Sequence, residues 1–305
     1  MTTQLNFIIY SREFDPNIGG YIALHRLCDL INRSGRTAYI YPITPTFPCK
    51  QSLRSLVYSA YTFCQILKIK SGIGFRTFPG FLTPIMAKKK DIGNAVVVYP
   101  EIIAGNPLGA KNVVRWLLHK PGFWTGVVDY GPNDLVFHFQ EAFYCKQLAQ
   151  PNAGQLQVLH LRDDIYRQTN FGKRKGTCYI LRKGSKRKPV HDLNDSTLID
   201  GLTHEEIAAV FNRVQMCISY DPYTLYSAYA AICGCTSVVM PEDGVDEAAW
   251  QPMEELRLGI AYGFDKIDWA KSTQHRVLAS LKQIERNSNR SVNEFIRKCD
   301  EYFTR

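Results

Sequence analysis

The sequence lacks any long, uninterrupted run of apolar residues. No such run approaches the ~18 residues that a helix needs to cross a bilayer. The first four residues, Met1-Thr2-Thr3-Gln4, also lack the basic start that is typical of a secretory signal peptide. We therefore expect a cytoplasmic protein, for which any contact with the inner face of the cytoplasmic membrane is peripheral.

Paired cysteines are lacking as well. The nine cysteines are odd in number and scattered, without a Cys-x-x-Cys motif, and the one close pair is Cys233 and Cys235. This pattern argues against a disulfide framework and against a structural zinc site. We expect reduced, mostly buried thiols, because a free cysteine behaves as a small apolar residue.

Several catalytic signatures are missing. The chain has no Gly-x-x-x-x-Gly-Lys-Ser/Thr phosphate loop, no Gly-x-Ser-x-Gly elbow and no His-Glu-x-x-His helix, which disfavours NTPase, serine hydrolase and zincin activities. Asp163 and Asp164 are adjacent and do not form an Asp-x-Asp motif that would hold a metal-bound diphosphate. We therefore expect no metal ion and no cofactor.

The length and composition indicate two globular domains. A chain of 305 residues with 45% hydrophobic and 21% charged residues is long enough for two cores, since domains usually hold roughly 100 to 200 residues. A polar, basic stretch begins near residue 150, and we place the boundary near 155. The predicted domains are 1–155 and 156–290, followed by a helix over 291–305 that packs back across them.

Strands and helices alternate in both halves. In the first, strand 5–10 precedes a loop with Gly19-Gly20, a helix from Tyr21 to Ser34-Gly35, and strand 37–41. Strand 95–99, helix 113–118 and strand 135–139 follow. In the second half we expect strands at 178–181, 216–219 and 236–240, and helices at 203–214, 224–233, 267–287 and 292–303. This βαβ order predicts an α/β fold with parallel sheets.

Positive charge is concentrated in two places. The formal net charge is +9, and the excess gathers at 88–90 and at 173–188. A nucleotide diphosphate, an anionic lipid and a nucleic acid all fit this charge, as does a solvated loop. Apolar residues recur at helical spacing over 53–70, ahead of the first cluster. That helix could lie on a membrane surface or pack within a core.

Candidate site residues follow the predicted strands. Arg182 and Lys183 come directly after strand 178–181, where fixed cations can hold a diphosphate and stabilise the charge that develops as it departs. Asp221, Thr224 and Ser227 lie at a predicted helix entrance, where they could face a bound anion or simply cap the helix.

Three further candidates come from the first half of the chain. Glu101 follows strand 95–99 at its carboxyl end, where open α/β sheets bind ligands. Asn106 lies in the following loop, and His138 alternates with apolar neighbours in strand 135–139, which also suits a half-exposed sheet residue. We expect these three to contact the acceptor, the second substrate to which a group would be transferred.

The run from Ile218 to Val239 resembles the donor site of retaining GT-B glycosyltransferases of the family-4-like group. Its residues resemble most a subset associated with the synthesis of bacterial surface polysaccharides. In that family two glutamates stand eight residues apart ahead of a Gly-x-Pro-Val-Val strand. Asp221 occupies the first position here and Tyr229 the second, a departure that leaves only a hydroxyl for the ribose. The segment 203–207 resembles the stretch preceding the family's donor turn, and Gly19-Gly20 its glycine-rich first loop.

This resemblance implies a GT-B fold, in which two Rossmann-like domains face each other across a cleft. It also implies transfer, with retention and without metal, of a sugar from a nucleotide sugar to a glycan or lipid-linked acceptor in polysaccharide or lipopolysaccharide synthesis. Arg182, Lys183 and Asp221 would be catalytic. The donor would be bound by Gly19, Gly20, Tyr223, Thr224, Ser227 and Tyr229.

Alternatives to the transferase remain open on the sequence. One is a nucleotide-sugar epimerase or a phosphorylase-like enzyme on the same fold, because a fold does not fix a function. Another is a basic module that binds anions or membranes. We do not expect nucleic-acid binding, since stacking aromatics do not alternate with the lysines of 173–188. A transferase that has lost activity is the last alternative, because Tyr229 replaces the second glutamate.

Overall fold

A computed structural model describes residues 4–43, 74–86 and 92–304. The chain divides into two compact units, which we call unit 1 (residues 1–160 and 287–305) and unit 2 (residues 161–286). Sequence analysis placed the corresponding boundaries at 155 and 290. The predicted helix 53–70 and the lysines 88–90 lie outside the described residues.

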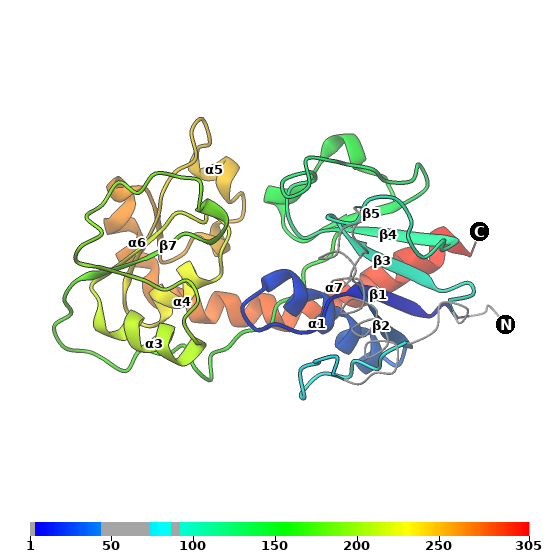
Figure 1. Ribbon diagram of the computed structural model, residues 1–305, viewed down its shortest axis with the longest axis horizontal. Coiled ribbons are helices and arrows are strands. Elements are labelled where there is room, and N and C mark those ends of the chain that lie inside the picture. The colour runs from blue at the N-terminus through cyan, green and yellow to red at the C-terminus, as the bar shows by residue number, and fades with distance from the viewer. Residues whose placement is uncertain (1–3, 44–73, 87–91, 305) are drawn as a thin grey trace, which may run out of the picture. The chain divides into compact units, whose positions relative to one another are not determined.

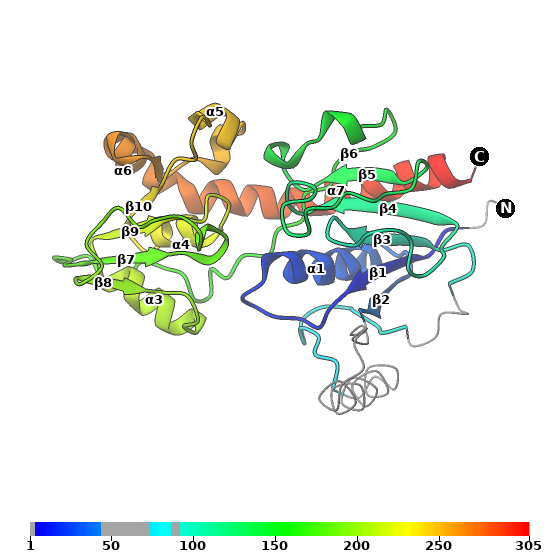
Figure 2. The same cartoon turned by 45° about the horizontal axis from the view of Figure 1, so that its top comes forward.

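Unit 1 contains a six-stranded, all-parallel sheet with strand order β2-β1-β3-β4-β5-β6, whose strands lie side by side in Figure 2. The strands are β1 (Phe7–Ser11), β2 (Ala38–Pro42), β3 (Val96–Pro100), β4 (Asn112–Leu117), β5 (Leu135–His138) and β6 (Gly154–Gln155). Helix α1 (Gly19–Arg33) connects β1 to β2. The predicted βαβ unit is therefore confirmed.

Alternate strand residues build cores on both faces of this sheet. Phe7 and Ile9 of β1 belong to one buried cluster, together with residues of α1, whereas Ile8 and Tyr10 belong to a second cluster on the opposite face. Because both faces are covered, the central strands read as continuous apolar runs, as buried parallel strands do.

Unit 2 contains a second all-parallel sheet with strand order β11-β10-β9-β7-β8. Its strands are β7 (Thr177–Ile180), β8 (Ser196–Leu198), β9 (Met216–Ser219), β10 (Thr236–Val239) and β11 (Ile260–Tyr262). Four helices that lie wholly within unit 2 are labelled in Figure 1: α3 (His204–Arg213), α4 (Tyr226–Ile232), α5 (Glu247–Trp250) and α6 (Ile267–Thr273). Two parallel α/β sheets confirm the predicted fold class of two Rossmann-like domains.

Helix α3 begins at a capping box. The Thr203 hydroxyl accepts the amide of Glu206, and the Glu206 carboxylate accepts the amide and hydroxyl of Thr203. These bonds satisfy amides that the first turn of a helix leaves without partners. They also lower the pKa of Glu206, chiefly through the backbone bond from Thr203.

Two predicted elements were wrong. The segment 113–118 is not a helix, because it forms β4 and pairs in parallel with β3 and β5. Its β-branched Val113 and Val114 favour a strand, and no helical period extends beyond one turn. The predicted break between helices 267–287 and 292–303 is also absent, since α7 runs without interruption from Val277 to Phe303.

The polar stretch 287–291, which resembled a break, lies within α7, and Ser288 there faces the protein interior. This residue is buried within α7, and its hydroxyl accepts the amide of Leu159. Further along the helix, Val292, Phe295, Ile296 and Cys299 belong to the core of unit 1. The C-terminal part of α7, drawn in red in Figure 1, is therefore part of that core. None of the helices in the described parts of the chain is long and apolar enough to cross a membrane.

Candidate functional site

The candidate site lies at the carboxyl edge of the unit 2 sheet, where the loop 181–188 follows β7 and the turn 220–225 follows β9. Strands β7 and β9 are paired in parallel, so both segments leave the sheet at the same edge. Gly184 brings them into contact. A Cβ atom at this position would stand 2.0 Å from the Tyr220 carbonyl oxygen, so the packing of this loop requires glycine.

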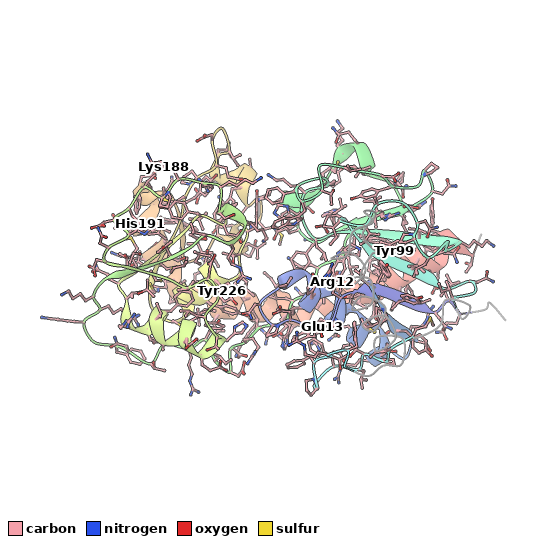
Figure 3. All side chains as sticks on the ribbon, viewed as in Figure 1. Arg12, Glu13, Tyr99, Lys188, His191 and Tyr226 are labelled. Carbon is pink, nitrogen blue, oxygen red and sulfur yellow. The ribbon has the colours of Figure 1, made fainter. Side chains whose placement is uncertain are left out.

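Arg182 has an unusual backbone. Its φ of 38° makes it the one non-glycine residue with positive φ in the described residues. The Asp200 carboxylate secures the loop by accepting the amides of Arg182 at 2.7 Å and of Leu181 at 3.3 Å. The Arg182 guanidinium carbon lies 4.8 Å from the ring centre of Tyr226, which is labelled in Figure 3. Strain held by the surrounding structure in this way is a feature of functional sites.

Lys183 and Asp221 form a partly buried ion pair. The Lys183 Nζ lies 3.6 Å from Oδ2 of Asp221, whose side chain is 1% exposed. Oδ1 of Asp221 accepts the amide of Tyr223 at 3.1 Å, whereas Oδ2 has no hydrogen bond. The Ser227 hydroxyl, also buried, likewise has none. Oδ2 of Asp221 and the Ser227 hydroxyl can therefore hydrogen-bond to groups of a ligand.

The turn after β9 differs from the predicted helix entrance. Helix α4 begins at Tyr226, and its cap position is Leu225 rather than Asp221 or Thr224. Thr224 instead accepts the amide of Tyr226 through its hydroxyl at 3.3 Å. Burial, followed by the neighbouring Glu242 carboxylate, raises the pKa of Tyr223, so this phenol stays neutral at pH 7. Glu242 was missed from the sequence, because nothing in its local pattern links it to Tyr223.

Arg187 differs from the other cations of the loop. Its guanidinium donates to the carbonyls of Tyr220 at 3.2 Å, Met240 at 2.9 Å and Pro241. It thereby joins the ends of β9 and β10. Lys186 and Lys188 are exposed. Within the loop 181–188, Arg187 therefore links the ends of two strands, whereas Lys186 and Lys188 face solvent.

Tyr229 is buried, and its hydroxyl accepts the amide of Arg162 at 3.1 Å. Its ring stacks on Tyr166 with a centroid separation of 3.9 Å and an interplanar angle of 8°. Burial raises the pKa of Tyr229, so the phenol is neutral. This geometry gives Tyr229 a structural role in joining α4 to the segment before β7, and its predicted contact with a ribose stays a prediction.

Gly19 and Gly20 do not form the predicted loop, because they are the first two residues of α1. The next two amides already make the first hydrogen bonds of the helix, since Tyr21 and Ile22 both donate to the Ile18 carbonyl, at 3.0 and 3.1 Å. A Cβ atom on Gly19 would meet nothing within 4 Å, and one on Gly20 would meet Leu118 at 3.7 Å. Their role in donor binding stays a prediction.

The acceptor-side candidates lie in unit 1. Buried Glu101 follows β3, and its Oε2 accepts the amide of Leu118 at 3.1 Å. His138 ends β5, contacts Glu141 at 3.0 Å and lines a cavity of about 120 Å³. Because β3 and β5 are parallel, both residues lie at the carboxyl edge of this sheet.

The side chain of Asn106 is hydrogen-bonded within its own loop. Its amide oxygen accepts the Tyr99 hydroxyl at 2.9 Å and the Ala110 amide at 3.0 Å, and its nitrogen donates to the Ala110 carbonyl at 2.8 Å. These bonds close the connection between β3 and β4. Arg115, missed because its strand was taken for a helix, is fully buried and pairs with Asp134 at 2.6 Å.

Among the described residues, no three His, Cys, Asp or Glu side chains are grouped so that they could hold a metal ion. The seven cysteines within these residues are free thiols, and six are buried.

Comparisons with known proteins give only distant likenesses. No family model and no curated protein matches the sequence. The structure is similar to a sucrose-phosphate synthase from Thermosynechococcus elongatus, with a TM-score of 0.43 and 10% identity over 95% of this chain and 94% of that one. It is also similar to an alpha-glucosyltransferase in complex with UDP, with a TM-score of 0.45 and 8% identity over 95% and 96% of the two chains.

Proposed function

We propose that this chain is a GT-B-type glycosyltransferase that binds a nucleotide diphosphate sugar at the carboxyl edge of the unit 2 sheet. The observation that carries the proposal is the grouping of Arg182, Lys183 and Asp221 there, with one buried carboxylate oxygen free of hydrogen bonds. Cations beside a free acceptor suit a ligand that combines phosphate with hydroxyl groups.

The proposed chemistry follows from these charges. As the bond from the anomeric carbon to the diphosphate breaks, negative charge grows on the leaving group, and Arg182 and Lys183 would stabilise it. Asp221 would accept a hydroxyl of the donor and hold Lys183 in place. Transfer would proceed with retention and without metal. The acceptor, a glycan or a lipid-linked sugar of polysaccharide synthesis, would contact Glu101 and His138 of unit 1.

The test is a turnover assay with matched variants. Candidate nucleotide sugars are incubated with the full chain, with and without glycan or lipid-linked acceptors, and released nucleoside diphosphate is measured. We expect Lys183→Ala to lower kcat/KM by about a hundredfold, the usual effect of losing one group that stabilises a transition-state charge. The control Lys186→Ala, an exposed cation of the same loop, should stay within about twofold.

Two outcomes would contradict the proposal. One is normal turnover by folded Lys183→Ala. The other is conversion of the donor into an isomeric nucleotide sugar without any acceptor, which would identify an epimerase.

A further inference from the structure

The loop 167–176, which leads into β7, presents one apolar side chain to solvent. Phe171 at its tip is 82% exposed, more than any other large hydrophobic residue among those the structure describes. A single exposed apolar residue is ordinary on a protein surface. What distinguishes this one is how the loop is held and which charges flank it.

The backbone that precedes Phe171 is anchored to buried Asn212. The Asn212 side-chain oxygen accepts the amides of Thr169 at 2.7 Å and Asn170 at 3.2 Å, and its nitrogen donates to the Arg167 carbonyl at 3.0 Å. Asn170 in turn donates to the Asn212 carbonyl at 2.9 Å and accepts the Gly172 amide at 2.9 Å. These bonds hold the tip outward, so Phe171 does not fold back onto unit 2.

Arg174 anchors the other arm of the loop. Its guanidinium donates to the carbonyls of Phe211, Asn170 and Cys233, each at 2.7 Å. The backbone amide of Lys175 donates a hydrogen bond to the Arg213 carbonyl at 3.3 Å. The Arg174 side chain is thus bound to backbone carbonyls of unit 2. The other cations of the loop, Arg167, Lys173 and Lys175, are exposed and can contact a partner.

The charged side chains of the loop 167–176 are all positive. Arg167, Lys173, Lys175 and Arg213 are all exposed. No Asp or Glu occurs in the sequence between Asp164 and Asp192. The acidic residue that lies near the loop is Asp195, whose Oδ1 would stand 3.8 Å from a Cβ atom on Gly176. An exposed apolar tip on a loop that carries exposed cations is complementary to an anionic phospholipid surface, where the tip enters the interface and the cations meet the phosphates.

We propose that the loop 167–176 is a membrane-docking site that binds the headgroup region of an anionic bilayer, with Phe171 inserted. The amides of Thr169, Asn170 and Gly172 are occupied by Asn212 and Asn170. The proposed recognition of the surface is by apolar burial and by charge. This inference does not depend on the proposed transferase activity. It places membrane contact on a loop of unit 2, whereas the segment that the sequence left open to either membrane contact or core packing is 53–70.

The experiment is cosedimentation of the full chain with vesicles. Vesicles of phosphatidylcholine alone are compared with vesicles of one part phosphatidylserine to two parts phosphatidylcholine. We expect binding to the anionic vesicles only, and we expect Phe171→Ser to weaken it about tenfold, in line with the loss of one buried aromatic side chain. Lys173→Gln with Lys175→Gln should weaken it similarly and reduce its sensitivity to salt.

The matched control is Val190→Ser, which removes another exposed apolar residue of unit 2 beside the cations 186–188. It should bind vesicles like the unaltered chain. Because Phe171 is so exposed, Phe171→Ser should keep the wild-type circular dichroism and Tm. Equal binding by Phe171→Ser and wild type, or equal loss in Val190→Ser, would overturn the proposal. So would a Phe171-dependent affinity for single-stranded oligonucleotides without vesicle binding, which would identify a nucleic-acid site.

Discussion

Residues of one charge have different roles in the loop after β7. From sequence, Arg182 and Lys183 are singled out because they follow the strand directly, whereas Lys186 and Arg187 are undistinguished members of a basic cluster. The structure separates them by their partners, which are an aromatic ring for Arg182, a buried carboxylate for Lys183 and backbone carbonyls for Arg187. Sequence could identify which residues reach this edge of the sheet. It could not assign their partners, because these lie in α4 and in the segments that follow β9 and β10, distant in the chain.

Arg187→Ala tests this division at the residue scale. We expect the variant to lose about 2 kcal/mol of the free energy of unfolding, since it leaves the carbonyls of Tyr220, Met240 and Pro241 without their donor. Lys186→Ala should change it by less than about 0.5 kcal/mol. Urea unfolding followed by circular dichroism measures both values. Equal stability of the two variants would show that the Arg187 contacts contribute nothing to folding.

At the scale of elements, sequence patterns predicted the parallel α/β order well. Each strand of four or more residues was predicted except β4, and α1 and α3 were found within two residues of their observed ends. The short strands β6, β8 and β11 were missed, because two or three residues carry too little pattern to identify a strand. Strand β4 was mistaken for a helix, because a strand buried on both faces has no alternation.

The junction between β1 and α1 should make stability depend on pH. Buried His25 of α1 contacts the carbonyl of Arg12, labelled in Figure 3, at 2.9 Å through Nε2, and its Nδ1 has no hydrogen bond. Burial lowers the pKa of His25, partly offset by the Arg12 carbonyl, so the folded chain holds it neutral.

The expected pH effect has a definite sign. The unfolded chain protonates His25 near its ordinary pKa of about 6.5 and the folded chain only at lower pH, so stability falls as pH drops below about 6.5. Tm measured from pH 8 down to about pH 5 should decline, and His25→Gln should reduce the slope. The same slope in both proteins would show that His25 is not the source.

At the scale of the whole molecule, each unit has its own sheet and core, and the end of the last helix belongs to the core of unit 1. Phe295 of α7 is 1% exposed and packs against Phe7 of β1 and Phe137 of β5, with centroid separations of 5.5 and 5.0 Å. The sequence indicated that the last helix packs back. It could not show which core the helix completes, because an amphipathic helix does not specify its partner.

Phe295→Ala should therefore destabilise unit 1 selectively. The usual cost of removing a buried phenylalanine ring is about 3 to 5 kcal/mol. Hydrogen exchange measured by mass spectrometry should show faster exchange in β1 and β5, while β9 of unit 2 keeps its protection. The exposed neighbour Asn293, replaced by alanine, is the control. Equal acceleration in both sheets would mean that the two units unfold as one.

The central claim is that the carboxyl edge of the unit 2 sheet binds a nucleoside diphosphate. Isothermal titration calorimetry of UDP, GDP, ADP and inorganic diphosphate into the wild type, Lys183→Ala and Lys186→Ala tests it most directly. We predict saturable binding that favours one nucleotide, at least about tenfold weaker in Lys183→Ala and unchanged in Lys186→Ala. No binding of any nucleotide by the wild type, or equal affinity in all three proteins, would contradict the account.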